Sequence, residues 1–131
     1  MHQIGEVAEA VSLSLRTIRH YEEVGLVPPS GRSAGGFRLY TDDDVDRLRV
    51  VKQMKPLDFS LEEMRELLEL RDQLAATAGG QEQSELVERL ELFAMTAEQR
   101  CEALREQLDA AQAMAQMLRR EARSHRLAVR R

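Results

Sequence analysis

The side chains best suited to binding chemistry lie on a short predicted helix near the start of the chain. Residues 14–25 read as this helix, because Ser14 suits an N-cap and Gly25 suits the position after the last turn. Helical spacing puts Arg16 and Arg19 on the face opposite the apolar side chains. An arginine that reaches a guanine edge is the commonest base-specific contact in protein–DNA complexes, so this face is expected to bind DNA. The predicted contacts on it are Arg16, Thr17, Arg19 and His20.

A second group of basic side chains follows on a predicted β-hairpin. Residues 27–40 contain two prolines, three glycines and no helical period, which favours two short strands around a Gly-rich tip. Arg32 and Arg38 belong to this hairpin, and residues 26–40 contain no acidic residue, so both arginines are expected to meet phosphate. For Phe37, on the return strand, packing beneath the hairpin and contact with DNA are equal alternatives.

Two other candidate contacts have a structural alternative. His20 either meets DNA or packs locally on its helix. Lys55, just before Pro56, either touches phosphate through a second wing or stays solvated. Tyr21 is expected in the core, because it shares a helix face with Ile18.

Four short helices are expected to position these side chains. They span about residues 4–10, 14–23, 41–55 and 60–76. Ser60 and Glu63 fit a capping box at the start of the last one. Two helices, a basic hairpin and two further helices in this order predict a mainly α fold, with a winged helix-turn-helix DNA-binding domain at residues 1–76.

The second half of the chain, residues 77–131, reads as a linker, a dimerisation helix and a basic tail. From residue 86, apolar side chains recur at spacings of three and four, which is a heptad pattern with one stutter. A lone helix would leave this stripe in water, so a partner helix is expected to cover it, and the simplest partner is a second copy. The predicted dimerisation residues are Leu86, Leu90, Phe93, Ala97, Cys101, Leu104, Leu108, Ala111, Ala115 and Leu118.

Composition limits the function classes. The net charge of −4 over 131 residues argues against a general coating role on nucleic acid, but it allows local basic patches. No apolar run approaches the roughly 20 residues of a membrane span, and no signal peptide is expected. A single cysteine excludes an intramolecular disulfide and suits a reducing cytoplasm, where the protein is expected to act. Because no acid–base pair or activated nucleophile is apparent, neither an enzyme nor a cofactor is expected.

The first half of the chain resembles the DNA-binding domain of the MerR transcriptional regulators. Order and spacing agree in five stretches, which are Ile4-Gly5-Glu6-Val7-Ala8, Arg16-Thr17-Ile18-Arg19-His20-Tyr21-Glu22, Gly25-Leu26-Val27-Pro28, Gly36-Phe37-Arg38-Leu39-Tyr40 and Phe59-Ser60-Leu61-Glu62-Glu63. The second half is similar only in kind, since this family continues with a long antiparallel dimerisation helix.

The resemblance implies a homodimer, joined by an antiparallel coiled coil, whose two winged helices bind successive grooves of double-stranded promoter DNA. Family members typically bend and untwist an overlong promoter spacer and so realign it for RNA polymerase. Two other functions stay open: an architectural or excision-type DNA-binding protein, and a dimeric interaction module without promoter distortion.

Three positions depart from the usual family residues. His20 stands where the family usually has tyrosine or phenylalanine, and Phe37 stands where tyrosine is common. Asp58 stands where the family usually has glycine, and aspartate tolerates a positive φ better than most residues. Metal- and redox-sensing members use at least two thiolates, whereas this chain has only Cys101, which falls on the apolar stripe, so a core cysteine and no metal site are expected. The arginines within residues 119–131 are expected either to form a solvated helix end or to bind phosphate or an anionic effector.

Overall fold

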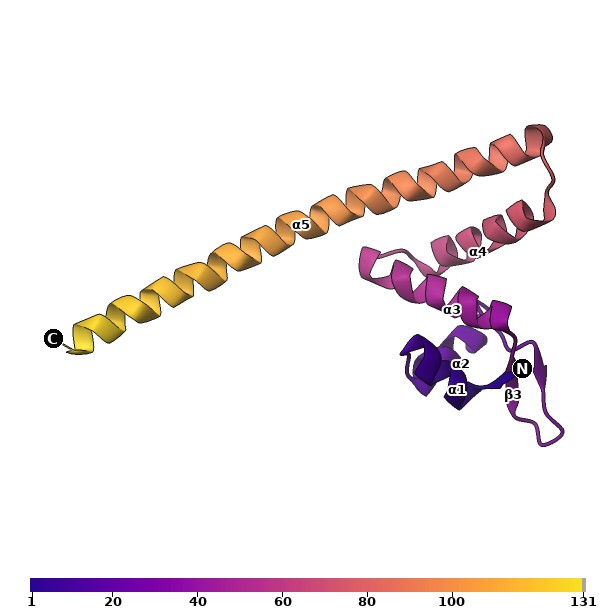
Figure 1. Cartoon of the computed structure of the whole chain (residues 1–131), viewed down its shortest axis with the longest axis horizontal. Helices are drawn as coiled ribbons and strands as arrows, with labels where there is room; N and C mark the ends of the chain where they lie inside the picture. The colour runs from indigo at the N-terminus through magenta and orange to yellow at the C-terminus, as the bar shows by residue number, and fades with distance from the viewer. Residues whose placement is uncertain (131) are drawn as a thin grey trace. The chain divides into compact units, whose positions relative to one another are not determined.

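The structure, a computed structural model, describes residues 1–130 and is mainly helical, with one small sheet (Figure 1). The helices are α1 (Ile4–Val11), α2 (Leu15–Glu23), α3 (Asp42–Met54), α4 (Leu61–Ala76) and α5 (Gly80–Arg130), with a short 3-10 helix, η1 (Lys55–Leu57), after α3. The strands are β1 (His2–Gln3), β2 (Gly31–Arg32) and β3 (Arg38–Tyr40). The chain divides into two compact units, Met1–Phe93 and the part from Ala94 onward.

The predicted hairpin is present, and a third strand joins it. The sheet is antiparallel with the order β1-β3-β2, so that Gln3 lies opposite Leu39 and Arg32 lies opposite Arg38. The sequence did not predict β1, because two residues carry no periodicity and the partner strand lies far along the chain. This pairing ties the start of the chain to the hairpin.

Side-chain caps fix where the helices begin, as predicted. At α2, Ser14 Oγ accepts a hydrogen bond from the backbone N–H of Thr17 at 3.0 Å. At α4, Ser60 and Glu63 form a capping box, in which the Glu63 N–H donates to Ser60 Oγ at 3.1 Å. Each cap satisfies an N–H that has no partner within its helix, and such caps typically stabilise a protein by about 1 kcal/mol.

The core of the first unit forms where the apolar helix faces meet. Ile18 of α2 has 0 % exposed surface, which confirms the predicted inward face of this helix, and Leu48 of α3 is buried to the same extent. Leu70 of α4 is also fully buried, although the sequence pattern did not mark it. Burial of its apolar face therefore holds α2 in place with its polar face outward.

The turns after α2 and after η1 each contain a residue with a left-handed backbone. Gly25, after α2, has φ +70°, and Asp58, after η1, has φ 58°. Asp58 therefore stands at a site where the usual glycine of the family is unstrained and where aspartate adopts the positive φ at some cost. The turn at Asp58 redirects the chain from α3 and η1 into α4.

Helix α5 is longer than predicted, because it begins at Gly80 and continues through the arginine-rich segment over 51 residues. Its first turns belong to the first unit, where Leu86 is buried and the Phe93 ring centroid lies 6.2 Å from that of Phe59. In the second unit, residues 101–130 are all exposed. Within residues 1–130, none of the helices combines the length and the apolar character that a membrane span requires.

Candidate nucleic-acid interface

Helix α2 has one packed face and one polar face. Ile18 is fully buried and Tyr21 is 3 % exposed, and burial raises the pKa of the Tyr21 hydroxyl. On the other side Arg16 and Arg19 are exposed, and so is His20, whose ring centroid lies 6.0 Å from that of Tyr21. The packed face fixes the helix, so the two arginines are presented to solvent from a rigid support.

A groove of about 860 Å³ runs along this polar face and brings the predicted contacts of α2 together with Lys55. Its lining residues are Arg16, Thr17, Arg19, His20, Tyr21, Glu23, Lys55, Phe59, Leu61 and Met64. Lys55 and the two arginines supply three cations against one carboxylate, Glu23. The sequence did not identify the apolar members of the lining, because they come from the η1–α4 segment, remote from α2 in the chain.

A hydrogen bond between α4 and the end of α2 fixes the two sides of this groove. Arg65 Nη2 donates to the backbone oxygen of Val24 at 2.7 Å. The contact is partly buried, so water competes for it less than at an open surface. The groove is therefore a preformed feature of the first unit, and its excess of positive charge suits a phosphate backbone.

Both hairpin arginines are held by one carboxylate of α2. Arg32 Nη2 donates to Glu22 Oε1 at 2.7 Å, and Arg38 Nε donates to Glu22 Oε2. The hydrogen bond to Glu22 raises the pKa of the Arg38 guanidinium above its ordinary value. The two arginines lie together and share an intramolecular partner, Glu22. The sequence did not predict this partner, because these ion pairs join different elements and leave no spacing signal.

The tip of the hairpin exposes Phe37. This side chain is 66 % exposed, so of its two predicted alternatives packing beneath the hairpin is wrong. A Cβ built at Gly35 would lie 3.1 Å from the Phe37 ring, so the absence of a side chain there lets the ring lie close to the backbone. Gly36 closes the turn with φ +82°, and its N–H donates to the Ser33 oxygen at 2.9 Å.

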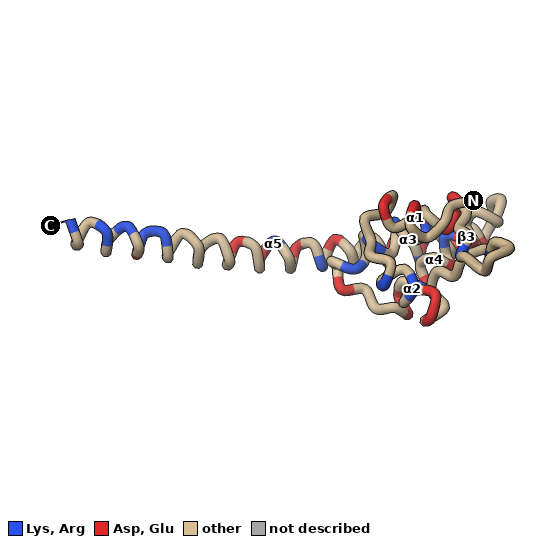
Figure 2. The backbone as a smooth tube through the Cα atoms, turned by 90° about the horizontal axis from the view of Figure 1, so that it is seen from below, with Lys and Arg blue, Asp and Glu red and all other residues tan. Residues whose placement is uncertain are grey.

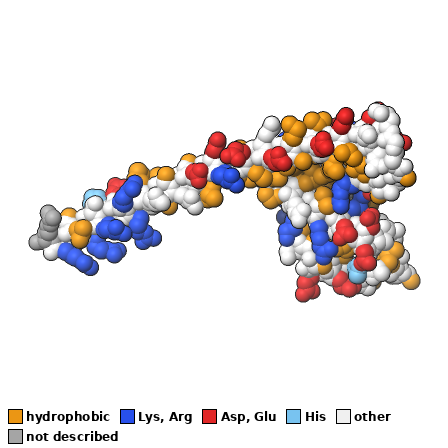
Figure 3. Space-filling model, turned by 45° about the horizontal axis from the view of Figure 1, so that its top comes forward, with side chains coloured by type: hydrophobic (Ala, Val, Ile, Leu, Met, Phe, Trp, Pro, Cys, Tyr) orange, Lys and Arg blue, Asp and Glu red, His pale blue; other side chains and the backbone are white. Residues whose placement is uncertain are grey.

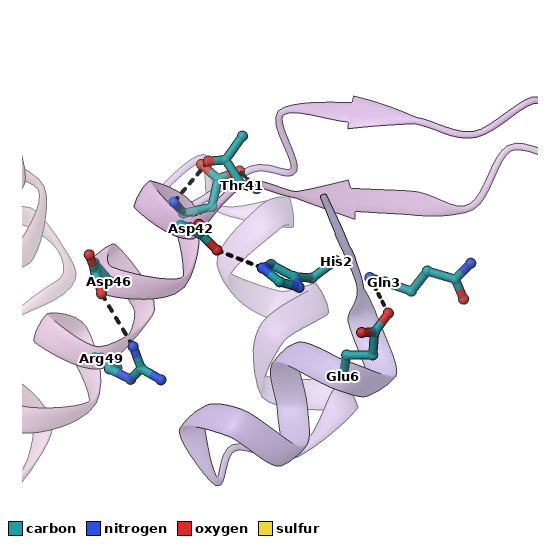
Figure 4. A network of polar contacts seen from close by, with 8 residues as sticks. His2, Gln3, Glu6, Thr41, Asp42, Asp46 and Arg49 are labelled. Atoms are coloured by element: carbon teal, nitrogen blue, oxygen red, sulfur yellow. Dashed lines mark hydrogen bonds and ion pairs between the residues drawn. The ribbon is translucent and has the colours of Figure 1, made fainter.

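A polar network anchors β1 to the starts of α1 and α3 (Figure 4). His2 Nε2 lies 2.6 Å from Asp42 Oδ1 at the start of α3, and this hydrogen bond lowers the pKa of Asp42. The Gln3 N–H donates to Glu6 Oε1 at 3.2 Å and caps α1. The network links strand and helix ends and includes none of the predicted DNA contacts.

The predicted dimerisation residues divide into two groups. Leu86 and Phe93 already have partners inside the first unit. Further along α5 the apolar side chains are open to solvent, and Leu104, Leu108 and Leu118 are 41 %, 55 % and 50 % exposed. Figure 3 shows hydrophobic side chains along this helix and a basic cluster near its end. Cys101 is a free, exposed thiol in the single chain, and no group of three or more metal-binding side chains occurs within residues 1–130.

Charge is segregated along α5 (Figure 2). Residues 80–109 contain eight acidic and three basic residues, whereas residues 110–130 contain one acidic and five basic residues. The helix therefore has a negative first part and a positive last part. All of its residues from 101 to 130 are exposed to solvent.

Two family descriptions match the sequence. "MerR HTH family regulatory protein" matches residues 3–70, and "MerR, DNA binding" matches residues 45–120. The transcriptional regulator ZntR of Escherichia coli K12 is 44% identical over 71 residues, which are 54% of this chain and 50% of ZntR. HmrR of Sinorhizobium medicae is 41% identical over 76 residues, 57% of this chain and 52% of HmrR. The chain thus spans about half the length of the curated relatives it matches.

Solved structures of similar fold agree with these matches. A MerR family regulator from Bacillus cereus aligns with a TM-score of 0.60 and 27% identity over 88% of this chain and 76% of that one. PbrR691 from Ralstonia metallidurans, solved in complex with lead(II), aligns with a TM-score of 0.53 and 34% identity, over 82% of this chain and 83% of that one. HiNmlR, a family member solved on promoter DNA, shares the fold, with a TM-score of 0.62 and 24% identity over 85% and 84% of the two chains. The chain belongs to the MerR family of helix-turn-helix regulatory proteins.

Proposed function

We propose that this protein is a homodimeric transcription regulator that binds promoter DNA and distorts an overlong promoter spacer. DNA binding is assigned to residues 1–76 and dimerisation to residues 77–131. The observation that carries the proposal is the groove along α2, where Arg16, Arg19 and Lys55 converge on one preformed surface. A rigid helix that presents two arginines beside a cationic groove combines base contacts with phosphate contacts, which is how helix-turn-helix proteins read DNA.

The exposed apolar stripe of α5 supports dimerisation. Leucines that are about half exposed in the single chain become more buried when a second helix covers them. The stripe also reads nearly the same in both directions: Leu104 pairs with Cys101, Leu108 with Ala97, and Ala115 with Leu90 about a midpoint between residues 102 and 103. A stripe with this symmetry suits an antiparallel pair of identical helices, whose twofold axis passes near residue 102.

The charge segregation of α5 favours the same orientation. An antiparallel pair brings the acidic part of one helix, residues 80–109, towards the basic part of the other, residues 110–130. A parallel pair would put like charges side by side, which is unfavourable by Coulomb's law. Both the apolar pattern and the charge pattern therefore support antiparallel association.

A dimer of this kind holds two DNA-binding units at a spacing fixed by helix packing. DNA whose half-sites do not match that spacing must bend or untwist to contact both units. Smooth bending of a 20–30 bp site costs on the order of 1–6 kcal/mol. Arg32, Arg38 and Lys55 of two copies provide six candidate phosphate contacts to offset this cost, and the regulator would thereby realign promoter elements for RNA polymerase.

Promoter activity and DNA shape test the proposal together. The promoter that the protein binds in vivo is expected to have an overlong spacer, and activation is expected to vanish when the spacer is shortened to the ordinary length. DNA cyclisation should show a bend in the complex. The contrary result has three parts: the footprint overlaps a promoter of ordinary spacing, the protein only represses that promoter, and no bend is detected. In that case distortion is the wrong mechanism, and the protein is a plain repressor.

A further inference from the structure

We propose that Glu22 is a positioning residue that orients the two hairpin arginines, Arg32 and Arg38, and lowers their attraction to non-target DNA. The inference rests on the proposed DNA-binding function and assigns Glu22 a role in specificity. Its basis is a three-residue cluster, here called the wing clamp, made of Glu22, Arg32 and Arg38.

The geometry of the wing clamp is that of a shared carboxylate. Arg32 and Arg38 are paired residues on β2 and β3, so their side chains leave the hairpin side by side. Each oxygen of Glu22 accepts from one of them, Oε1 from Arg32 Nη2 at 2.7 Å and Oε2 from Arg38 Nε. The Glu22 side chain is 21 % exposed, so the two ion pairs lie partly out of water. The hairpin is thereby tied directly to the DNA-reading helix.

The clamp leaves donors for a phosphate. A guanidinium carries five N–H donors in a fixed fork. Glu22 takes one donor from each arginine, and the Gly36 oxygen takes one from Arg32 at 3.2 Å. The arginine side chains are 47 % and 28 % exposed, so their remaining donors can face a phosphate while Glu22 keeps the planes oriented. Pre-oriented side chains lose less conformational freedom on binding than free ones.

The clamp also changes the charge of the hairpin. Two arginines and one carboxylate have a net charge of +1, whereas the arginines alone have +2. Attraction to any DNA depends on how many phosphates the protein neutralises, whatever the sequence. Glu22 therefore reduces non-target binding, while in the target complex the same carboxylate keeps both arginines in position.

The test compares Glu22→Gln with Glu69→Gln in the full chain. Glutamine keeps the shape of the side chain and one acceptor oxygen but removes its charge, and Glu69 is an exposed α4 residue outside the clamp and the groove. Affinity is measured for a 30-bp duplex selected from a random library with the wild type and for an unselected 30-bp duplex, at several salt concentrations. Thermal melting monitors folding.

For Glu22→Gln we expect tighter binding to the unselected duplex, by about 5–30-fold at 0.15 M salt, if the dimer neutralises one or two more phosphates. The slope of log K against log salt should steepen by about 0.9 for each additional phosphate. The affinity for the selected duplex should rise less, so specificity falls. Loss of a merely structural ion pair would instead weaken binding to both duplexes without steepening the slope, and that result would overturn the proposal.

Two further variants make the outcome decisive. When Arg32→Ala and Arg38→Ala are also present, Glu22→Gln should no longer tighten non-target binding, and a tightening that persists would contradict the clamp. Glu22→Asp keeps the negative charge but shortens the side chain, so it should weaken binding to the selected duplex and leave the salt slope for the unselected duplex unchanged. If Glu22→Gln melts at a much lower temperature than the wild type, Glu22→Asp replaces it in the test. If the wild type binds the selected and unselected duplexes equally well, the proposed DNA-binding function is refuted. If only Glu22→Gln fails to change the affinities and the salt slope, the role of Glu22 is refuted and the proposed function is not.

Discussion

Replacing Leu104 and Leu108 with aspartate is expected to convert the protein to a monomer. Burying a leucine side chain completely is worth about 1.5–3 kcal/mol. In the single chain these leucines are 41 % and 55 % exposed, so roughly half of that value, about 1 kcal/mol each, is available on association. Four leucines in a dimer then contribute about 4 kcal/mol, or nearly a thousandfold in the dissociation constant.

The introduced carboxylates add to this loss, because burying a charge without a partner is unfavourable. Sedimentation velocity at micromolar concentration is the assay, with the wild type expected as a dimer. The control is Ala110→Asp with Ala113→Asp, which adds the same charge on the side of α5 away from the stripe. If the control dissociates as fully as the leucine variant, net charge and not the apolar stripe governs association. A wild type that sediments as a monomer would refute the reasoning outright.

Three other predictions follow from the same structure. Arg16→Ala or Arg19→Ala should weaken binding to a selected duplex by about 1–3 kcal/mol per lost base contact. Arg38→Ala should weaken binding to all duplexes alike and reduce the dependence of affinity on salt concentration in binding titrations. Cys101→Ser should leave DNA affinity and any transcriptional response to copper, zinc or oxidant unchanged. Leu104→Cys with Cys101 retained should give an intermolecular disulfide on non-reducing gels, because position 104 of one helix lies opposite Cys101 of the other in the proposed antiparallel pair. Asp58→Val should lower the free energy of unfolding by about 1–2 kcal/mol in denaturant melts, because a β-branched residue is strained at φ 58°, and Asp58→Gly should not lower it.

Local signals allowed much of the fold to be predicted from the sequence. Ser14 and Ser60 marked helix starts because an N-cap acts within one turn. The positive φ of Asp58 was not itself predicted, but the usual glycine of the family at this position allowed for it. The inward side of α2 followed from the spacing of Ile18 and Tyr21, and the outward position of Arg16 followed from the same period.

Features that depend on contacts between distant segments were missed. β1 is too short to show a period and exists because β3 pairs with it. Glu22 looked like an ordinary helix residue, since its role depends on two arginines brought by the hairpin. Phe93 belonged to the apolar stripe by spacing, but in the folded chain its ring lies against Phe59, a residue of another segment.

Affinity cleavage tests most directly whether two α2 helices read DNA together. An iron chelate would be attached at residue 23 in a chain carrying Glu23→Cys and Cys101→Ser, since Glu23 lines the groove along α2. On a selected duplex, we expect two clusters of cuts whose centres are separated by about 10–10.5 bp or a multiple of it, as two helices in major grooves require. A single cluster, or cuts no more localised than those from a chelate at residue 113 of α5, would contradict the account.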